Sequence, residues 1–421
     1  MGVKVAVVGG GSTYTPELVE GFVTRTDRLP VDELVLLDID PERLAIVGAL
    51  AERMVRAAGW AGTVRMTDRA NEALEGANFV IVQLRVGGNQ ARLLDETIPL
   101  RFGCIGQETT GPGGFAKALR TVPVVLELAE RTAEIGAADA WVVDFTNPTG
   151  LVTQALLDQG HRAGGLCNVA IGVQRELAAH LHVEPSTIRL DHVGLNHLSW
   201  VRAVIVDGVD RLPELMEEAP EELTEAAPIE LVRALGAIPS SYLRYYYRTG
   251  EVLEHQRTHR TRAEEVIEIE AGLLELYRDP TLAAKPQLLE ERGGAWYSDA
   301  AAALVASLHA GSGDEQVVNV LNEGAIPNVP HGDVVELTCR VDRAGAFARP
   351  TEPLAPEMLG LVQHAKAYER LTIEAALTGS RDTALKALLT NPLVGDVDRA
   401  APMLDALLDA NRAHLPRFFA D

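Results

Sequence analysis

Features that would place the chain outside a reducing compartment are missing from its sequence. It has only three cysteines, Cys104, Cys167 and Cys339, widely spaced in 421 residues and in no disulfide pattern. No apolar run approaches the roughly 20 residues that cross a bilayer. The opening residues, MGVKVAVVGGG, hold no extended apolar stretch before the glycines, so we expect no signal peptide. We therefore expect a cytoplasmic protein with no membrane partner.

Basic residues are scarce relative to acidic ones, 38 against 60, which gives a formal net charge of −22. A nucleic-acid binder needs a basic face, so this balance argues against a nucleic-acid partner. It leaves room for a small anionic ligand, because surface charge is screened over roughly 8 Å at physiological salt. The hydrophobic content of 47% is ordinary for a globular protein and is enough for a large core.

The N-terminal segment has the pattern of a dinucleotide-binding unit. Residues 3–8 (VKVAVV) are typical of a buried parallel strand, and a GGGS turn and a helical stretch follow. Such a helix points its first N–H groups at a pyrophosphate. Asp38 ends a second strand, 27 residues after Gly11, where a carboxylate binds ribose hydroxyls and repels a 2′-phosphate, which favours NAD. Gly9 and Gly11 fit the G-x-G-x-x-G spacing, whereas Tyr14 stands at the third position.

The rest of the chain predicts an α/β protein in two parts. Further strands at 78–84 and 140–146 flank a helical stretch, as in a doubly wound sheet. Short strands are expected in GLCNVAIG (165–172) and RLDHVGLNHLSWVRAVIV, and helices within 207–235, 264–310 and 355–415. We therefore predict a Rossmann-type NAD-binding domain over 1–195 and a C-terminal α+β catalytic and oligomerisation domain over 196–421.

A cysteine and a histidine stand after two strand-like stretches. Cys167 lies in GLCNVAIG, and His197 follows 30 residues later in GLNHLSW. A thiolate and an imidazole are acceptable ligands for Mn²⁺, Zn²⁺ or Fe²⁺, with substrate oxygens completing the shell. The alternative is a buried structural cysteine and a hydrogen-bonded histidine, and spacing alone does not decide between them.

Three other segments carry polar residues in unusual settings. GQETTGPGGF is a glycine-rich loop with Glu108, and FTNPTG places Asn147 at the end of a strand, the edge where ligands bind in open α/β sheets. Asn147 also fits an ordinary Asx turn. IPSSYLRYYYRTG has four tyrosines, among them Tyr242, and the pattern alone does not pick a catalytic one.

Taken together, these segments resemble glycoside hydrolase family 4. The resemblance is carried by GGGSTYTPELV, RVGGNQARLLDE, GQETTGPGGFAKALRTVP, FTNPTG, GLCNVAIG, GLNHLSW, IPSSYLRYYY and ERGGAWYSDAA. It runs from the first strand to NPLVGD near residue 391 and is strongest to the 6-phospho-β-glucosidase branch. It implies a C-terminal lobe like that of lactate and malate dehydrogenases, and a homodimer or homotetramer.

The resemblance also implies a hydrolysis assisted by oxidation, in a family whose NAD-dependent members depart from two-carboxylate glycoside hydrolysis. NAD⁺ oxidises C3 of the sugar, the metal polarises the resulting ketone, and a base removes the C2 proton. The C1–O bond then breaks by elimination, water adds, and the sugar is reduced again, so no NAD is consumed. The expected substrate is a phosphorylated disaccharide or aryl glucoside, with NAD and Mn²⁺ or another divalent metal as cofactors.

Residue by residue, the resemblance makes Cys167 and His197 the metal ligands. Tyr242 matches the base, and Glu108 matches a residue that raises the basicity of that tyrosine. A free tyrosine has a pKa of about 10, so its phenolate needs help from nearby positive charge.

The substrate contacts implied by the resemblance are Arg92, Asn147, Asn168 and Arg292. Arg292 resembles a phosphate-binding arginine, whose planar fork can bind two phosphate oxygens. The expected cofactor-binding residues are Gly9, Gly11, Ser12, Thr13, Asp38 and Arg43.

Two residues depart from the family pattern. Ala170 stands where a proline is common, which would loosen that loop. Asn168 stands where α-acting relatives tend to carry an aspartate that protonates the leaving group. Asn168 therefore favours a β-linked substrate and leaves the proton donor unassigned.

The sequence alone leaves other functions open. Within the family, the substrate could be a glycoside without phosphate or with an α linkage. Outside it, an NAD-dependent 2-hydroxyacid dehydrogenase would make net NADH without a metal. A non-enzymatic NAD-sensing module would require Cys167, His197 and Tyr242 to be incidental.

Overall fold

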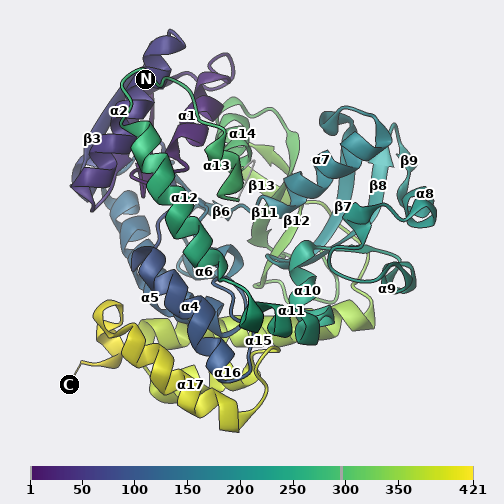
Figure 1. Ribbon diagram of the computed structural model, residues 1–421. Helices are drawn as coiled ribbons and strands as arrows, with labels where there is room; N and C mark the ends of the chain where they lie inside the picture. Colours follow the sequence, from purple (N-terminus) through teal and green to yellow (C-terminus); the bar gives the residue numbers. More distant parts are fainter. Residues whose placement is uncertain (1, 294–296, 421) are drawn as a thin grey trace.

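The computed structural model describes residues 2–293 and 297–420 and is built around one nine-stranded sheet (Figure 1). Six neighbouring strands are parallel, in the order β3-β2-β1-β4-β5-β6. They are β1 (Val3–Val8), β2 (Val31–Leu37), β3 (Thr63–Thr67), β4 (Phe79–Val82), β5 (Trp141–Asp144) and β6 (Ala163–Gly165). This is the strand order of a doubly wound dinucleotide-binding fold, so the predicted fold class is confirmed.

Three strands from the C-terminal half extend this sheet beyond β6. They are β11 (Asp314–Leu321), β12 (Val334–Asp342) and β13 (Gly345–Ala348), and each runs antiparallel to its neighbours. The join is narrow, since β11 pairs with β6 at Asn319 and Gly165. Segments from both halves of the chain therefore form one continuous sheet.

A second, smaller antiparallel sheet packs beside the first, with the order β10-β8-β7 and β9 paired to β8. Its strands are β7 (Ile188–Leu195), β8 (Leu198–Val206), β9 (Val209–Asp210) and β10 (Ile238–Pro239). β7 and β8 form a hairpin whose two-residue turn is Asn196 and His197. The predicted division between residues 195 and 196 falls at this turn, and it stays a prediction.

Helices cover both faces of the main sheet, because alternate side chains of a buried strand point to opposite faces. Val5 and Val7 of β1 pack with one set of helices, and Ala6 and Val8 pack with the other. The first set is α1 (Thr15–Val23), α2 (Pro41–Ala57) and α14 (Tyr297–Ala310). The second is α3 (Ala70–Leu74), α5 (Gly111–Ile135), α6 (Thr149–Asp158), α15 (Pro356–Thr378), α16 (Arg381–Thr390) and α17 (Val397–Ala410).

Some of the remaining helices pack against the two sets above, and others pack against the second sheet. α12 (Arg262–Tyr277) contacts both α2 and α4 (Gly88–Arg101), as its long diagonal course in Figure 1 shows. The others are α7 (Val169–Leu181), α8 (Leu212–Glu218), α9 (Ile229–Leu235), α10 (Arg244–Tyr247), α11 (Thr249–Thr258) and α13 (Leu288–Glu291). Among the described residues, none of the helices has both the length and the apolar character needed to cross a membrane.

Most expected elements are present, with one clear error. The hairpin expected in RLDHVGLNHLSWVRAVIV forms, and so do helices in the three C-terminal regions. The strand expected over GLCNVAIG is wrong, because β6 ends at Gly165 and α7 begins at Val169. Ala170, Leu177 and Ala178 are buried at helical spacing along α7, and this longer periodicity decides the structure.

Candidate active site

Loops at the carboxyl ends of β1, β4 and β5, together with the start of α7 after β6, line a cavity of about 1900 Å³. Ligand pockets commonly measure about 300–1000 Å³, so this cavity has room for more than one ligand. Predicted site residues that line it are Gly9, Gly11, Ser12, Asp38, Arg43, Arg92, Glu108, Asn147, Asn168, Tyr242 and Arg292. Thr13, Cys167 and His197 are buried and are not among the lining residues.

One end of the cavity is the glycine-rich loop after β1, which lies against neighbouring strands. Gly9 has a φ of +86°, and a Cβ there would lie 2.8 Å from the carbonyl oxygen of Gln83. The backbone N–H of Gly11 donates to Oδ2 of Asp38 at 2.8 Å. Glycine is therefore required for this close packing, and the turn lies against Asp38, at the position whose acid contacts ribose in dinucleotide-binding folds.

Glu270 of α12 ties this loop to its surroundings. Its carboxylate accepts from Nη2 of Arg43 at 3.1 Å, from Nε of Arg292 at 2.9 Å and from Asn89 at 2.8 Å. Burial alone would raise the pKa of Glu270, but Arg292 and Arg43 lower it to about 2. The guanidinium of Arg292 also lies over the ring of Tyr14, 3.9 Å from its centroid. Arg292 therefore lies beside the glycine-rich loop, in contact with Tyr14 and Glu270.

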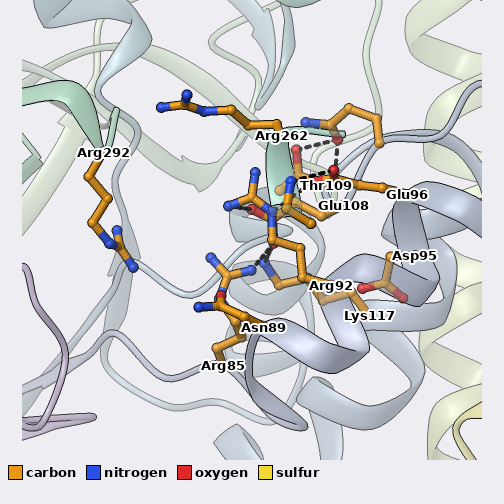
Figure 2. A network of polar contacts seen from close by, with 12 residues as sticks. Arg85, Asn89, Arg92, Asp95, Glu96, Glu108, Thr109, Lys117, Arg262 and Arg292 are labelled. Carbon is orange, nitrogen blue, oxygen red and sulfur yellow. Dashed lines mark hydrogen bonds and ion pairs between the residues drawn. The ribbon is translucent and has the colours of Figure 1, made fainter. Parts of the chain in front are cut away.

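Glu108 is surrounded by three cationic side chains. It forms ion pairs with Arg85, with Nζ of Lys117 at 2.7 Å and with Nη1 of Arg92 at 3.3 Å. Burial would raise the pKa of Glu108, but the three cations outweigh it and hold the pKa well below 4.5. Figure 2 shows this group on and around α4, with Arg292 drawn well away from it. The carboxylate is therefore a fixed negative charge beside the cavity.

Lys117 and Arg92 are themselves held in place within this cluster. Burial lowers the pKa of Lys117 to about 8, although the nearby Glu108 opposes the change. Nε of Arg92 donates to Glu96 at 2.7 Å, and Glu96 accepts the backbone N–H of Ala263 at 2.7 Å. This second acid links Arg92 to the start of α12.

Tyr242, which lines the cavity, forms a stacked pair with the buried His197. Their ring centroids are 3.6 Å apart and their planes differ by 3°. Nδ1 of His197 lies 3.1 Å from Oγ1 of Thr109, which leaves Nε2 as the nitrogen for a metal. Burial lowers the pKa of His197 to about 4, so the ring is neutral near pH 7, the form that binds metals.

The backbone at His197 has a conformation that is uncommon for a residue other than glycine. It has a φ of +64°, in the left-handed region that a non-glycine residue enters at a cost of about 1–3 kcal/mol. A glycine or asparagine would fit this turn position more easily.

Cys167 lies close to the same pair. It precedes Asn168, the N-cap residue of α7, so its sulfur sits near the positive end of the helix dipole. Burial raises the pKa of Tyr242, and the charge of the nearby Cys167 raises it further. Asn147 and Asn168 line the cavity beside them, after β5 and at the start of α7.

A thiol and a neutral imidazole around one tyrosine suit a divalent metal. Within residues 2–293 and 297–420, no group of three or more His, Cys, Asp and Glu side chains could hold a metal. Cys167 and His197 are therefore two candidate ligands, and a metal held by them would take its other ligands from substrate and solvent. A site with open positions suits catalysis, whereas structural sites are closed by protein ligands.

The structure adds residues that sequence reasoning did not select, namely Arg85, Thr109, Lys117 and Glu270. A signal was available for Lys117, because it interrupts a buried apolar stretch of α5, where a charge needs a partner. Arg85 and Glu270 carry no such signal, because their partners come from distant segments.

Family models match almost the whole chain. The model described as family 4 glycosyl hydrolase matches residues 4–183, and the model of its C-terminal domain matches residues 192–394. A Bacillus subtilis protein named probable 6-phospho-beta-glucosidase is 45% identical over 99% of this chain and 98% of its own length. These matches cover both parts of the fold.

Solved structures of related proteins agree with the family match. The 6-phospho-beta glucosidase from Thermotoga maritima, solved with manganese, NAD⁺ and glucose-6-phosphate, is 38% identical and has a TM-score of 0.92. The match covers 98% of this chain and 99% of that one. The malate dehydrogenase of Cryptosporidium parvum is 15% identical with a TM-score of 0.55, over 90% of this chain and 99% of its own, which shows a shared fold alone.

Proposed function

Because the chain belongs to glycoside hydrolase family 4, we propose that it hydrolyses 6-phospho-β-glucosides with NAD and a divalent metal, Mn²⁺ in the first instance. One observation carries the proposal. A single cavity joins the glycine-rich loop and Asp38 at one end to Tyr242, Asn147 and Asn168 at the other. A nicotinamide cofactor and a sugar can therefore meet between these ends.

The cofactor end is assigned to Gly9, Gly11, Ser12, Thr13, Asp38 and Arg43. Asp38 already accepts the N–H of Gly11, and its remaining acceptor capacity suits a ribose hydroxyl. Its negative charge also disfavours a 2′-phosphate. When bound, NAD supplies a reversible oxidation at C3 of the sugar, so the cofactor is not consumed.

The metal ligands are Cys167 and His197. A divalent metal held there supplies positive charge that acidifies the C2–H of the oxidised sugar and favours the phenolate of Tyr242. Thr109 orients the imidazole through Nδ1. The stacked Tyr242 keeps the base beside the same ligand.

Tyr242 removes the C2 proton, and loss of that proton lets the C1–O bond break. Burial and the nearby charges of Cys167, Tyr245 and Glu108 all raise the pKa of Tyr242, which makes its phenolate a stronger base once formed. Glu108 contributes through its fixed charge, since three cations already share its oxygens. This supports the role assigned to it beside the base.

Substrate contacts are assigned to Arg92, Asn147, Asn168 and Arg292. The 6-phosphate is assigned to Arg292, which lines the same cavity from the side of the glycine-rich loop. Its Nη1 is not used by the bonds to Glu270. Asn168 is an amide at the cavity wall and cannot donate a proton as an acid does, which favours a β-linked substrate. The proton donor to the leaving group is not assigned.

A panel of chromogenic glycosides tests the proposal. The p-nitrophenyl α- and β-glucosides, each with and without a 6-phosphate, are assayed with NAD⁺, Mn²⁺ and a reductant. Turnover of the 6-phospho-β-glucoside that EDTA abolishes and Mn²⁺ restores is expected. Net NADH from a 2-hydroxyacid without metal would instead establish a dehydrogenase.

Two further expectations concern the whole molecule. A ligand thiol such as Cys167 has to stay reduced, which supports a cytoplasmic location. The proposed assembly is a homodimer or homotetramer, with the domain over 196–421 supplying helices for the contact. Light scattering on the purified protein measures the subunit number directly.

A further inference from the structure

A largely buried polar cluster adjoins the backbone segments of the proposed metal ligands, and none of the chemistry above uses it. We call it the Glu336 cluster: His192, Asn196, Asn319 and Glu336. Oε1 of Glu336 accepts from Nδ2 of Asn196 and from Nδ2 of Asn319, both at 3.2 Å. Its Oε2 lies 3.1 Å from Nε2 of His192. One carboxylate on β12 thus joins side chains from three other positions.

The cluster connects the two backbone segments that carry the proposed metal ligands. Nδ2 of Asn319 also donates to the carbonyl oxygen of Gly165 at 3.3 Å, and Gly165 ends β6 two residues before Cys167. Asn196 is the residue before His197 in the hairpin turn. Glu336 therefore bridges the end of β6 and the β7–β8 turn, which belong to different sheets.

A third segment of the site is held at the same point. Oδ1 of Asn196 accepts the backbone N–H of Gly150 at 3.4 Å, at the start of α6 and three residues after Asn147. The turn residue Asn196 thus bonds both the main sheet, through Glu336, and the loop that carries Asn147.

Burial keeps the hydrogen bonds of the Glu336 cluster in place. Glu336 is 1% exposed, Asn319 is 1% exposed and His192 is 3% exposed. Burial would raise the pKa of Glu336, but hydrogen bonds from His192 and Asn196 lower it, so the carboxylate stays charged. A buried charge that lost these donors would be strongly unfavourable, so the three bonds are kept together.

Resting on the proposed function, we propose that Glu336 is a positioning residue for the metal. It sets the separation of the segments that carry Cys167 and His197. Thr109 hydrogen-bonds the imidazole ring of His197, whereas Glu336 holds the backbone of the turn through Asn196 and places its negative charge near that ring. Outer partners of this kind commonly matter about 10–100-fold in metal affinity.

The test measures Mn²⁺ affinity directly, from the electron paramagnetic resonance signal of free Mn²⁺ titrated with protein. Glu336→Gln preserves the volume but removes the charge and one accepting oxygen. Asn196→Ala removes the hydrogen bond between the turn and Glu336, and leaves Glu336 bonded to His192 and Asn319. In each variant the Mn²⁺ dissociation constant is expected to rise about 10-fold or more, while NAD⁺ affinity measured by calorimetry stays unchanged.

The double variant tests whether the two side chains act through their mutual hydrogen bond. If both side chains act through the same contact, Glu336→Gln with Asn196→Ala raises the dissociation constant by less than the product of the two single effects. With Co²⁺ in place of Mn²⁺, the thiolate-to-metal absorption band reports whether Cys167 still binds. Weakening of that band is expected in each variant.

Glu369→Gln is the matched control, because Glu369 is also a buried carboxylate, paired with Nζ of Lys366 at 2.8 Å on α15. It is expected to lower the melting temperature and leave Mn²⁺ affinity as in the wild type. Unchanged Mn²⁺ affinity in folded Asn196→Ala and Glu336→Gln would overturn the positioning role; if Glu336→Gln does not fold, Asn196→Ala decides alone. A wild-type protein that binds no Mn²⁺ would overturn the proposed function itself, which is a separate result.

Discussion

The imidazole ring of His197 lies flat against the phenol ring of Tyr242, with centroids 3.6 Å apart and planes 3° apart. A proposed metal ligand and a proposed base are therefore neighbours in one rigid stack. The stack needs only the two rings, whereas proton removal needs the tyrosine hydroxyl. These two roles can be separated by removing one oxygen atom.

Replacing Tyr242 with phenylalanine keeps the ring and removes the base. We expect turnover to fall about 10²–10⁴-fold, the usual contribution of a general base, with Mn²⁺ affinity close to that of the wild type. Exchange of the sugar C2 proton with solvent deuterium should stop. Tyr245→Phe is the control, since Tyr245 meets Tyr242 edge-on at 5.9 Å. Exchange that persists in Tyr242→Phe would clear Tyr242 of the base role.

Replacing Cys167 with serine removes the thiolate. The Mn²⁺ affinity should fall by more than the roughly 10–100-fold that loss of an outer partner costs. Most activity should be lost, while NAD⁺ still binds. Cys104→Ser is the matched control, because Cys104 is also buried but packs in the hydrophobic core and is not a proposed ligand. Full turnover and unchanged Mn²⁺ binding in Cys167→Ser would remove Cys167 from the metal site.

Arg292 and Arg43 share Glu270, which allows a matched comparison. Arg292→Met should lower kcat/KM for the 6-phosphorylated substrate about 10–100-fold, the worth of one charge-assisted contact, with a smaller effect on the unphosphorylated glucoside. Arg43→Met should raise the KM for NAD⁺ and affect both sugars equally. Equal losses on both sugars in Arg292→Met would argue against phosphate recognition by Arg292.

Glu270 should make the fold sensitive to acid. Burial would raise its pKa, but Arg292 and Arg43 lower it from an ordinary 4.5 to about 2. A carboxylate with a lowered pKa stabilises the fold above the unfolded value and loses that effect as pH falls toward the folded value. The shift corresponds to roughly 3 kcal/mol.

Urea unfolding of the wild type and Glu270→Gln measures this effect. Their free energies of unfolding should differ by roughly 3 kcal/mol at about pH 7, and the difference should shrink steadily between about pH 4.5 and pH 2. A difference that stays constant over this range would mean that the ion pairs of Glu270 are not its source.

Local patterns were enough to predict the strand, glycine turn and helix at the proposed cofactor end of the site. The strand, the glycines and Asp38 are close in sequence, and their spacing follows from the geometry of one strand, turn and strand. The hairpin that carries His197 was likewise predictable from its alternating apolar residues. GLCNVAIG was misread as strand, because a short apolar run does not distinguish a strand from the start of a helix.

Long-range pairings could not be read from the sequence. Glu270 reaches Arg43, which is 227 positions away, and Glu336 reaches Asn196, which is 140 positions away. Local periodicity carries no information on such contacts, because they depend on how the two sheets pack. The continuation of the main sheet through β11, β12 and β13 was missed for the same reason.

Hydrolysis of a 6-phospho-β-glucoside in D₂O tests the central claim most directly. With NAD⁺, Mn²⁺ and a reductant present, the released glucose 6-phosphate should carry deuterium at C2, and the absorbance of NADH should show no net increase. A product formed at full rate with no deuterium at C2 would contradict hydrolysis by C3 oxidation and C2 deprotonation.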